Sequence, residues 1–210
     1  MITIPDYSKT YFQLLNGKEV TEKYLIYPLK PIPIKDVFFV NIDYEKVKKE
    51  VEKISDFLKM VFGNKLVKVE HVGSTSIKNM PGTAISDLIV YVDPFPPSNR
   101  SLAILDSSGF KFRGIAPHSY TKEDLFFVRQ PEHPILKDDY SNFAFHIVPK
   151  HSTELDSLIK FRDIANSDPI VHDEYKKVKL QAYNSPNIRT FFEYKRDKTI
   201  NARPMWRKIL

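Results

Sequence analysis

The sequence predicts an α+β chain with a mixed α/β arrangement, in which helices pack against one small mixed sheet. Three observations support this class: an amphipathic helix pattern near residue 50, short apolar runs of strand length in mid-chain, and helical patterns towards the end. With 210 residues, 42% of them hydrophobic, the chain can bury one substantial core. We therefore expect a single domain over residues 1–210, with residues 1–36 as an N-terminal extension and residues 186–210 as a basic C-terminal segment.

The first helix is expected over residues 43–62. Its apolar residues follow a 4-3-4-3 spacing, with lysines and glutamates between them. Asp43 is placed to cap the start of this helix, and Gly63 can supply the left-handed residue after its end. The apolar positions are Val47, Val51, Ile54, Leu58 and Val61.

Four apolar runs are candidates for strands: residues 66–72, 84–92, 125–129 and 143–148. The run at 84–92 is almost wholly apolar, which is typical of a strand in the centre of a sheet. Residues 66–72 instead alternate apolar with charged side chains, as a strand with two different faces does.

Further helices are expected over residues 99–108, from near Ser152, and from Asp168 onwards. Asp168 is a favoured capping residue and is followed by proline, which suits the first helical position. Helices therefore follow the strands along the chain, which favours the α+β class.

The composition excludes several kinds of site and of protein. The sequence has no cysteine, so disulfides, thiolate metal sites and cysteine nucleophiles are ruled out. No run approaches the roughly 18 apolar residues that a membrane span needs, and the first residues lack the pattern of a signal peptide. We expect a cytoplasmic protein with no membrane partner.

The positive charge is concentrated at one end of the chain. The net charge is +6, and residues 186–210 contain seven Lys or Arg against Glu193 and Asp197. This segment is either a solvated tail or an edge that contacts phosphates, including those of a nucleic acid.

The most informative stretch is His71-Val72-Gly73-Ser74-Thr75-Ser76-Ile77, which is followed nine residues later by Asp87 in a strand. A glycine at the end of a strand lets a phosphate approach the backbone, because no Cβ stands in the way. The amides and the three hydroxyls after Gly73 can donate to phosphate oxygens. A carboxylate on the adjoining strand can hold a divalent metal on the same phosphates.

This order of strand, Gly-Ser turn, strand and Asp resembles the nucleotidyltransferase superfamily of DNA polymerase beta-like enzymes. More closely, the chain resembles the GrpB family over roughly residues 37–200. That family has a His-(Ile/Val)-Gly-Ser-Thr-Ser-(Val/Ile) run before a strand with the pattern Ile-Asp-Ile. Further matches downstream are Phe143 to Val148, Phe161-Arg162-Asp163, Pro169, Tyr175, Lys179, Tyr194 and Lys198.

The resemblance implies a nucleotidyltransferase fold that binds a nucleotide or another phosphorylated ligand together with Mg²⁺ or Mn²⁺. The reaction it implies is transfer of a nucleotidyl or phosphoryl group to a small acceptor. Asp87 would be the metal ligand, and Asp87 and His146 the catalytic residues. The phosphate- or nucleotide-binding residues would be His71, Gly73, Ser74, Thr75, Ser76, Arg162, Lys179 and Lys198.

The chain also departs from the family pattern. Thr83 replaces the usual lysine, and Ile89 occupies the position, two residues after Asp87, where an active nucleotidyltransferase needs a second carboxylate. Two metal ions cannot be held by one carboxylate, unless a loop delivers Asp138 or Asp139. The sequence thus leaves three hypotheses: a transferase, a catalytically degenerate protein that binds an anion or nucleotide, and a nucleic-acid-binding module that uses the basic C-terminus.

Individual residues have two interpretations as well. Asp87 either binds a ligand or metal or forms a structural salt bridge, for which Arg162 is a candidate. His71 and His146 are either core histidines or site residues. In the functional interpretation we expect His71, His146 and Arg162 to converge on one cleft beside Asp87.

Overall fold

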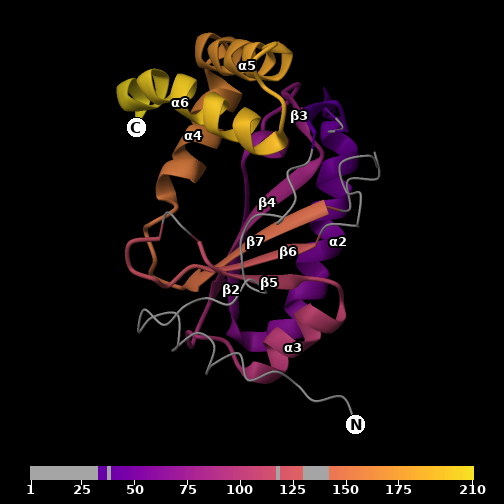
Figure 1. The fold of residues 1–210 in the computed structure, drawn as a ribbon. Coiled ribbons are helices and arrows are strands. Elements are labelled where there is room, and N and C mark those ends of the chain that lie inside the picture. The colour runs from indigo at the N-terminus through magenta and orange to yellow at the C-terminus, as the bar shows by residue number, and fades with distance from the viewer. Residues whose placement is uncertain (1–32, 37–38, 117–118, 130–141) are drawn as a thin grey trace.

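A five-stranded mixed sheet forms the centre of the computed structural model, which describes residues 33–36, 39–116, 119–129 and 142–210 (Figure 1). The strands lie in the order β2 (Leu66–Val72), β4 (Ile85–Val92), β7 (Asn142–Pro149), β6 (Leu125–Arg129) and β5 (Lys111–Ile115). The neighbours β4 and β7 run parallel, and the other pairs are antiparallel. The predicted α+β class with a mixed sheet is confirmed.

Two helices cover one face of the sheet. They are α2 (Tyr44–Phe62) and α3 (Asn99–Ser107). Alternate residues of β4 point into this layer, because successive side chains of a strand leave on opposite faces. Leu88, Val90 and Val92 pack there with Leu58 of α2 and Leu102 of α3 in the largest apolar cluster.

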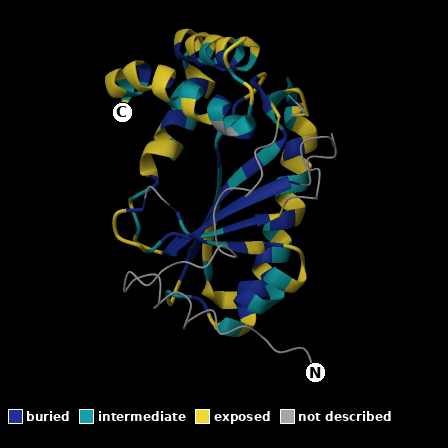
Figure 2. Cartoon of the chain, in the orientation of Figure 1, coloured by how far each residue is buried: buried dark blue, intermediate teal, exposed yellow. Residues whose placement is uncertain are grey.

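The opposite face carries the other residues of β4 and meets the C-terminal helices. Ile89 and Tyr91 pack with Val72, Val148 and Leu155 in a smaller cluster. The helices α4 (Asp156–Ser167), α5 (Pro169–Asn184) and α6 (Phe191–Ile209) gather at one end of the sheet (Figure 1). The central strands β4 and β7 are the most deeply buried part of the sheet (Figure 2).

The turn after β2 connects the sheet with the layer formed by α4, α5 and α6. It contains a single 3₁₀ turn, η4 (Ser74–Ser76), and leads into the short strand β3 (Pro81–Thr83), which pairs with β1 (Phe39–Asn41). Ile77 and Met80 of this connection are fully buried against side chains of α4, α5 and α6. The loop is therefore fixed between the sheet and the three C-terminal helices.

Most elements expected from the pattern are present. Asp43 caps α2 by accepting a hydrogen bond from the Lys46 amide, and Gly63 ends it with φ +58°. Asp168 caps α5, with proline in its first turn. The strands β3 and β5 and the whole of α6 were not predicted. In the described part of the chain no helix is long and apolar enough to cross a membrane.

Candidate functional site

Gly73 and Asp87 lie side by side, as the strand–turn–strand order predicts. Val72, the last residue of β2, is paired with Asp87 near the start of β4, so Gly73 follows directly beside that carboxylate. Gly73 has φ +74°, a conformation that glycine adopts without strain. A Cβ at this position would collide with the carboxylate of Asp87. The glycine is thus required both by the backbone and by the close approach of the acid.

A second glycine brings a lysine and a serine together. A Cβ built on Gly82 of β3 would stand 2.7 Å from Lys179 Nζ and 3.1 Å from Ser74 Oγ. The ammonium group of α5 and the first hydroxyl of the Gly-Ser turn therefore both lie against the backbone of Gly82. These two predicted phosphate-binding groups meet at one place.

Lys179 is buried, and its ammonium group has no protein acceptor in the described ranges. The side chain is 1% exposed. No hydrogen bond or ion pair from Nζ to any described residue is found; its recorded contact is with the ring of Tyr175, 5.4 Å from Nζ to the ring centre. Burial lowers the pKa of Lys179 well below its ordinary value, Lys198 lowers it further, and Asp87 opposes both effects. A buried, unpaired ammonium group is costly, so this position is suited to receive an anion.

Tyr175 lies near Asp87 and Lys179, and Tyr194 lies near Tyr175. Burial, and then the nearby carboxylate of Asp87, raise the pKa of Tyr175. Burial and the neighbouring Tyr175 and Tyr183 raise the pKa of Tyr194. Both hydroxyls are therefore neutral donors at physiological pH. Neither donates to an acceptor within the residues that the structure describes, although Tyr175 is only 5% exposed and Tyr194 only 3%.

The helix α6 adds two more cations near Asp87. The surrounding protein lowers the pKa of Lys198, an effect that Asp87 opposes. The surrounding protein also lowers the pKa of Lys195, Asp87 raises it, and Lys198 lowers it. Lys195 itself is an exposed residue. Asp87 is thus within electrostatic reach of three lysines, which come from two helices.

Three of the predicted ligand-binding residues make hydrogen bonds within the turn itself. The hydroxyl of Ser76 donates to the carbonyl oxygen of Gly73 at 2.6 Å. Thr75 Oγ1 lies 2.9 Å from Nε2 of His71, and Thr75 is fully buried. These groups stabilise the loop, and a direct contact of Thr75, Ser76 or His71 with a ligand remains a prediction.

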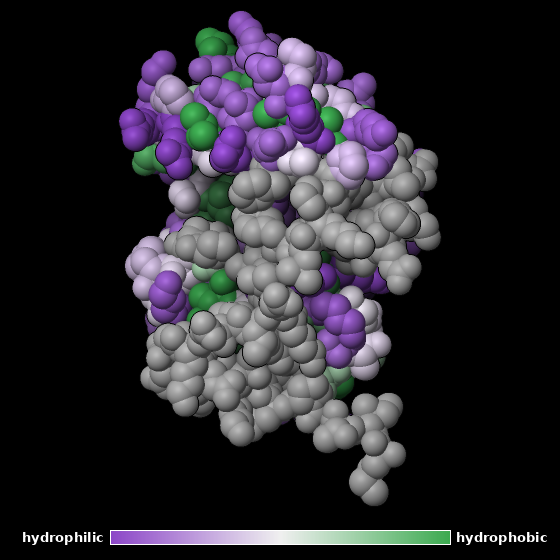
Figure 3. All heavy atoms as spheres, in the orientation of Figure 1, coloured by the Kyte–Doolittle hydropathy of each residue, from purple (hydrophilic) through white to green (hydrophobic). Residues whose placement is uncertain are grey.

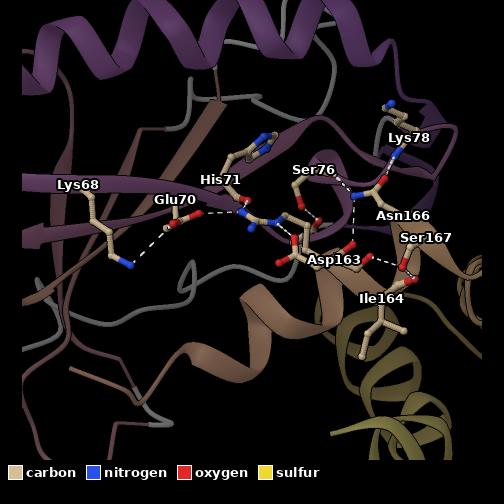
Figure 4. A network of polar contacts seen from close by, with 11 residues as sticks. Lys68, Glu70, His71, Ser76, Lys78, Asp163, Ile164, Asn166 and Ser167 are labelled. Carbon is tan, nitrogen blue, oxygen red and sulfur yellow. Dashed lines mark hydrogen bonds and ion pairs between the residues drawn. The ribbon is translucent and has the colours of Figure 1, made fainter. Parts of the chain in front are cut away.

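The expected convergence of two histidines and an arginine on the cleft is wrong for His71. His71 is paired with Leu88 across the two strands, so its side chain lies on the face covered by α2, opposite to Asp87. In Figure 4 its ring points towards α2. Burial first, and then Arg162, lower the pKa of His71 to about 4. His71 is therefore a half-buried, neutral histidine on the face of the sheet that α2 covers.

Arg162 also makes its hydrogen bonds with residues other than Asp87. Its guanidinium donates to Glu70 Oε2 at 2.9 Å, to the carbonyl oxygen of His71 at 2.9 Å and to Asp163 Oδ1 at 2.8 Å (Figure 4). The proposed structural salt bridge with Asp87 is thus replaced by one with Glu70. Arg162 fastens α4 to β2, beside an open groove of about 560 Å³ that none of the predicted site residues lines.

His146 lies on the same face of the sheet as Asp87. It is paired with Ile89 on β4, and Asp87 with Ala144. Its Nδ1 is 2.9 Å from one carboxylate oxygen of Asp124 and 3.1 Å from the other. The side chain of Ile89 has no oxygen to offer and is fully buried. The residues that the structure describes at this place therefore do not fit a site for two metal ions held by paired carboxylates.

Sequence reasoning missed several members of this arrangement. Lys195 was counted only as part of the basic C-terminal segment, because α6 was not predicted and its spacing to Lys198 could not be read on a helix. Tyr175 and Tyr194 were matched to the family without a role. Asp124 precedes a predicted strand, and nothing in the pattern connects it with His146. The predicted alternatives Asp138 and Asp139 lie outside the described residues.

The sequence model of the GrpB family, described as GrpB protein, matches residues 40–205. The UPF0157 protein BH1888 of Halalkalibacterium halodurans is 27% identical over 125 residues, which are 58% of this chain and 57% of that protein. The UPF0157 protein YqkA of Bacillus subtilis is 24% identical over 127 residues, which are 59% of this chain and 33% of that protein. The chain thus matches little more than half of the length of the first of these relatives and a third of the second.

Two solved structures show similar arrangements. The crystal structure of the conserved protein GrpB from Enterococcus faecalis has a TM-score of 0.58 and 21% identity, covering 80% of this chain and 99% of that chain. This likeness establishes a shared fold. The structure of Cid1 in complex with its short product ApU has a TM-score of 0.42 and 11% identity, covering 86% of this chain and 46% of that chain. A likeness of that size does not define a function.

Proposed function

The chain belongs to the GrpB family, and from the geometry beside Asp87 we propose that it binds a nucleotide or another phosphorylated small molecule. The phosphates would lie between the Gly73-Ser74 turn and the lysines of α5 and α6. Ser74 and Lys179 would donate to phosphate oxygens, and Lys198 would add positive charge. Tyr175 and Tyr194 extend the set of donors beyond the residues expected from the sequence.

One observation carries this proposal. The ammonium group of Lys179 is almost fully buried, lies against Gly82 near Ser74, and has no described acceptor. Such a group destabilises the protein unless a counter-ion occupies the space beside it. Several donors around one carboxylate favour a ligand that has many acceptor oxygens, and phosphate groups have this property.

A divalent cation, Mg²⁺ or Mn²⁺, would join the ligand to Asp87. A single carboxylate can hold such an ion through waters and ligand phosphates. Ile89 prevents the paired arrangement that two-metal nucleotidyl transfer requires. We therefore propose binding as the principal property, with transfer of a nucleotidyl or phosphoryl group weak or absent.

Titration calorimetry with inorganic pyrophosphate and a panel of nucleoside mono-, di- and triphosphates tests this function. The loss of one charge-assisted hydrogen bond in Lys179→Met should weaken binding about 10- to 100-fold. Lys177→Met is the matched control, because Lys177 is an exposed residue of the same helix and its loss changes the charge equally. Equal affinities of Lys179→Met and the wild type, or no binding by the wild type, would reject the proposal.

A further inference from the structure

The strand β2 forms one edge of the central sheet. It pairs with β4 on one side, and no strand of the described ranges pairs with it on the other. The groove of about 560 Å³ beside Arg162 is lined by Lys68 and Glu70, so the side chains of these two residues border open space. An edge strand presents backbone donors and acceptors that can pair with a strand of another chain.

The order of charges along β2 makes the strand complementary to a second copy of itself. Lys68 and Glu70 lie on either side of Val69, and both side chains leave the strand on the same face of the sheet (Figure 4). When two copies of β2 run antiparallel about a two-fold axis at Val69, this valine lies opposite its own equivalent. Lys68 of each copy then lies opposite Glu70 of the other copy.

Within one copy, Lys68 reaches its acid only along the strand. Its Nζ lies 3.7 Å from Glu70 Oε1, and 48% of the lysine side chain stays exposed. Residues two apart on one strand are about 6–7 Å apart, whereas Cβ atoms directly opposite in an antiparallel pair are about 4.5–5.5 Å apart. Opposite charges in such positions stabilise strand pairing, so two copies gain two ion pairs across the axis.

The same pairing covers an apolar side chain that one copy leaves in water. Val67, next to Lys68, is 50% exposed. Counted from the axis at Val69, it comes opposite His71 of the other copy, and His71 is only half-buried. Removal of this apolar area from water favours the paired arrangement further.

The strand at the other edge of the sheet lacks this complementarity. The five residues of β5 contain two basic residues, Lys111 and Arg113, and no acid. Two antiparallel copies of β5 would bring like charges together, which opposes pairing. Pairing between copies is therefore expected of β2 and not of β5.

We infer that the β2 edge is an interface between two copies of this chain, in which the β2 strands pair antiparallel about a two-fold axis at Val69. The two sheets then form one continuous sheet across the axis. The paired segment, residues 67–71, is short for a dimer interface, so we expect a weak dimer with a Kd of about 10–100 µM. Lys68, Val69 and Glu70 have no part in the proposed phosphate site, and the inference does not rest on the proposed function.

Sedimentation equilibrium over a range of concentrations around this Kd tests the interface. Lys68→Glu puts two acids opposite each other on both sides of the axis, and should weaken dimerisation at least about 10-fold. Lys48→Glu is the matched control, because Lys48 is an exposed residue of α2 and its substitution changes the charge equally. This control should dimerise as the wild type does, and both variants should bind pyrophosphate with the wild-type affinity.

A single introduced cysteine tests the register, because the chain has no cysteine of its own. Val69→Cys places two thiols directly opposite each other, with Cα atoms about 4.5–5.5 Å apart, and this separation suits a disulfide. Oxidation with diamide should therefore crosslink the two copies. Val67→Cys is the control: its two copies are displaced by four residues along the strands, about 13 Å, and should stay uncrosslinked.

Three results would overturn the inference. The first is a wild type that stays monomeric throughout, which would leave the edge to a different partner. The second is equal dimerisation of Lys68→Glu and Lys48→Glu, and the third is crosslinking of Val67→Cys as fast as that of Val69→Cys. If Val69→Cys does not fold, the comparison of the two charge variants still decides the question.

Discussion

A methyl group added at Gly73 would collide with the carboxylate of Asp87 and would force an unfavourable positive φ. The Gly73→Ala variant should therefore lose about 2–4 kcal/mol of unfolding free energy and its affinity for pyrophosphate, because Asp87 must move. Chemical denaturation and calorimetry measure the two effects. Gly63→Ala is the matched control: Gly63 also has a positive φ of 58°, but nothing lies within 4 Å of the added Cβ. This control should lose stability through strain alone and keep its affinity.

The burial of His71 predicts how stability depends on pH. Its pKa is about 4 in the folded protein, against 6.5 for an ordinary histidine. Between pH 6.5 and about 4, His71 is protonated in the unfolded chain but not in the folded protein. The free energy of unfolding therefore falls as the pH drops through this range. The loss from this residue is at most about 3 kcal/mol. Urea denaturation at pH 7 and pH 4.5 should show a smaller loss in His71→Gln than in the wild type, and equal losses would contradict the assignment.

At the scale of elements, Arg162 connects α4 to the edge strand β2 of the sheet. Arg162 joins α4 to Glu70 and to the carbonyl oxygen of His71 on β2. Arg162→Met leaves that carboxylate and carbonyl without their donor, and should lower the free energy of unfolding by about 1–3 kcal/mol. Asp163→Asn removes the more exposed of the two ion pairs and should change stability by less than about 1 kcal/mol. Equal effects of the two substitutions would show that Arg162 is not the anchor.

Elements with strong local patterns could be predicted, and elements that depend on tertiary contacts could not. The helix at residues 44–62 has a regular apolar stripe and a capping residue, so its bounds were close to those expected. The helix α6 contains Pro204 and many charges, and only its first turn carries a clear signal, the capping box of Thr190 and Glu193. The short strands β1 and β3 exist because they pair with each other, which no local pattern reveals.

The site was predictable to the extent that it follows the Gly-Ser turn. Gly73 and Asp87 are adjacent because two consecutive strands of the motif pair, and this could be read from the sequence. The roles of His71 and Arg162 could not be predicted. The face of the sheet on which a side chain lies depends on the register between strands, and here His71 is paired with Leu88. The contact of Asp124 with His146 joins the residue before β6 to β7 across 22 residues, and spacing alone does not indicate it.

At the scale of the whole molecule, the candidate site lies where the sheet meets the C-terminal helices. The sheet supplies Asp87 and Gly73, α5 supplies Lys179, and α6 supplies Lys195 and Lys198. Other basic residues of α6 are exposed, and the C-terminal helices present a mainly hydrophilic surface (Figure 3). These exposed residues are Arg196, Arg203 and Arg207. Lys179 is buried and Lys198 half-buried, whereas Lys195 is exposed like this surface. Nucleic-acid binding by the exposed basic residues remains a prediction.

In the proposed function, Lys179 stays buried to bind an anion, at a cost in stability. Because its pKa lies below that of a lysine in the unfolded chain, the folded protein is penalised for burying the group at neutral pH. Thermal unfolding of the wild type and of Lys179→Met, each with and without pyrophosphate, tests this directly. We predict that Lys179→Met unfolds at a higher temperature without ligand, by about 1–3 kcal/mol of unfolding free energy, and that pyrophosphate no longer stabilises it. A variant that is less stable than the wild type yet still stabilised by pyrophosphate would contradict the account.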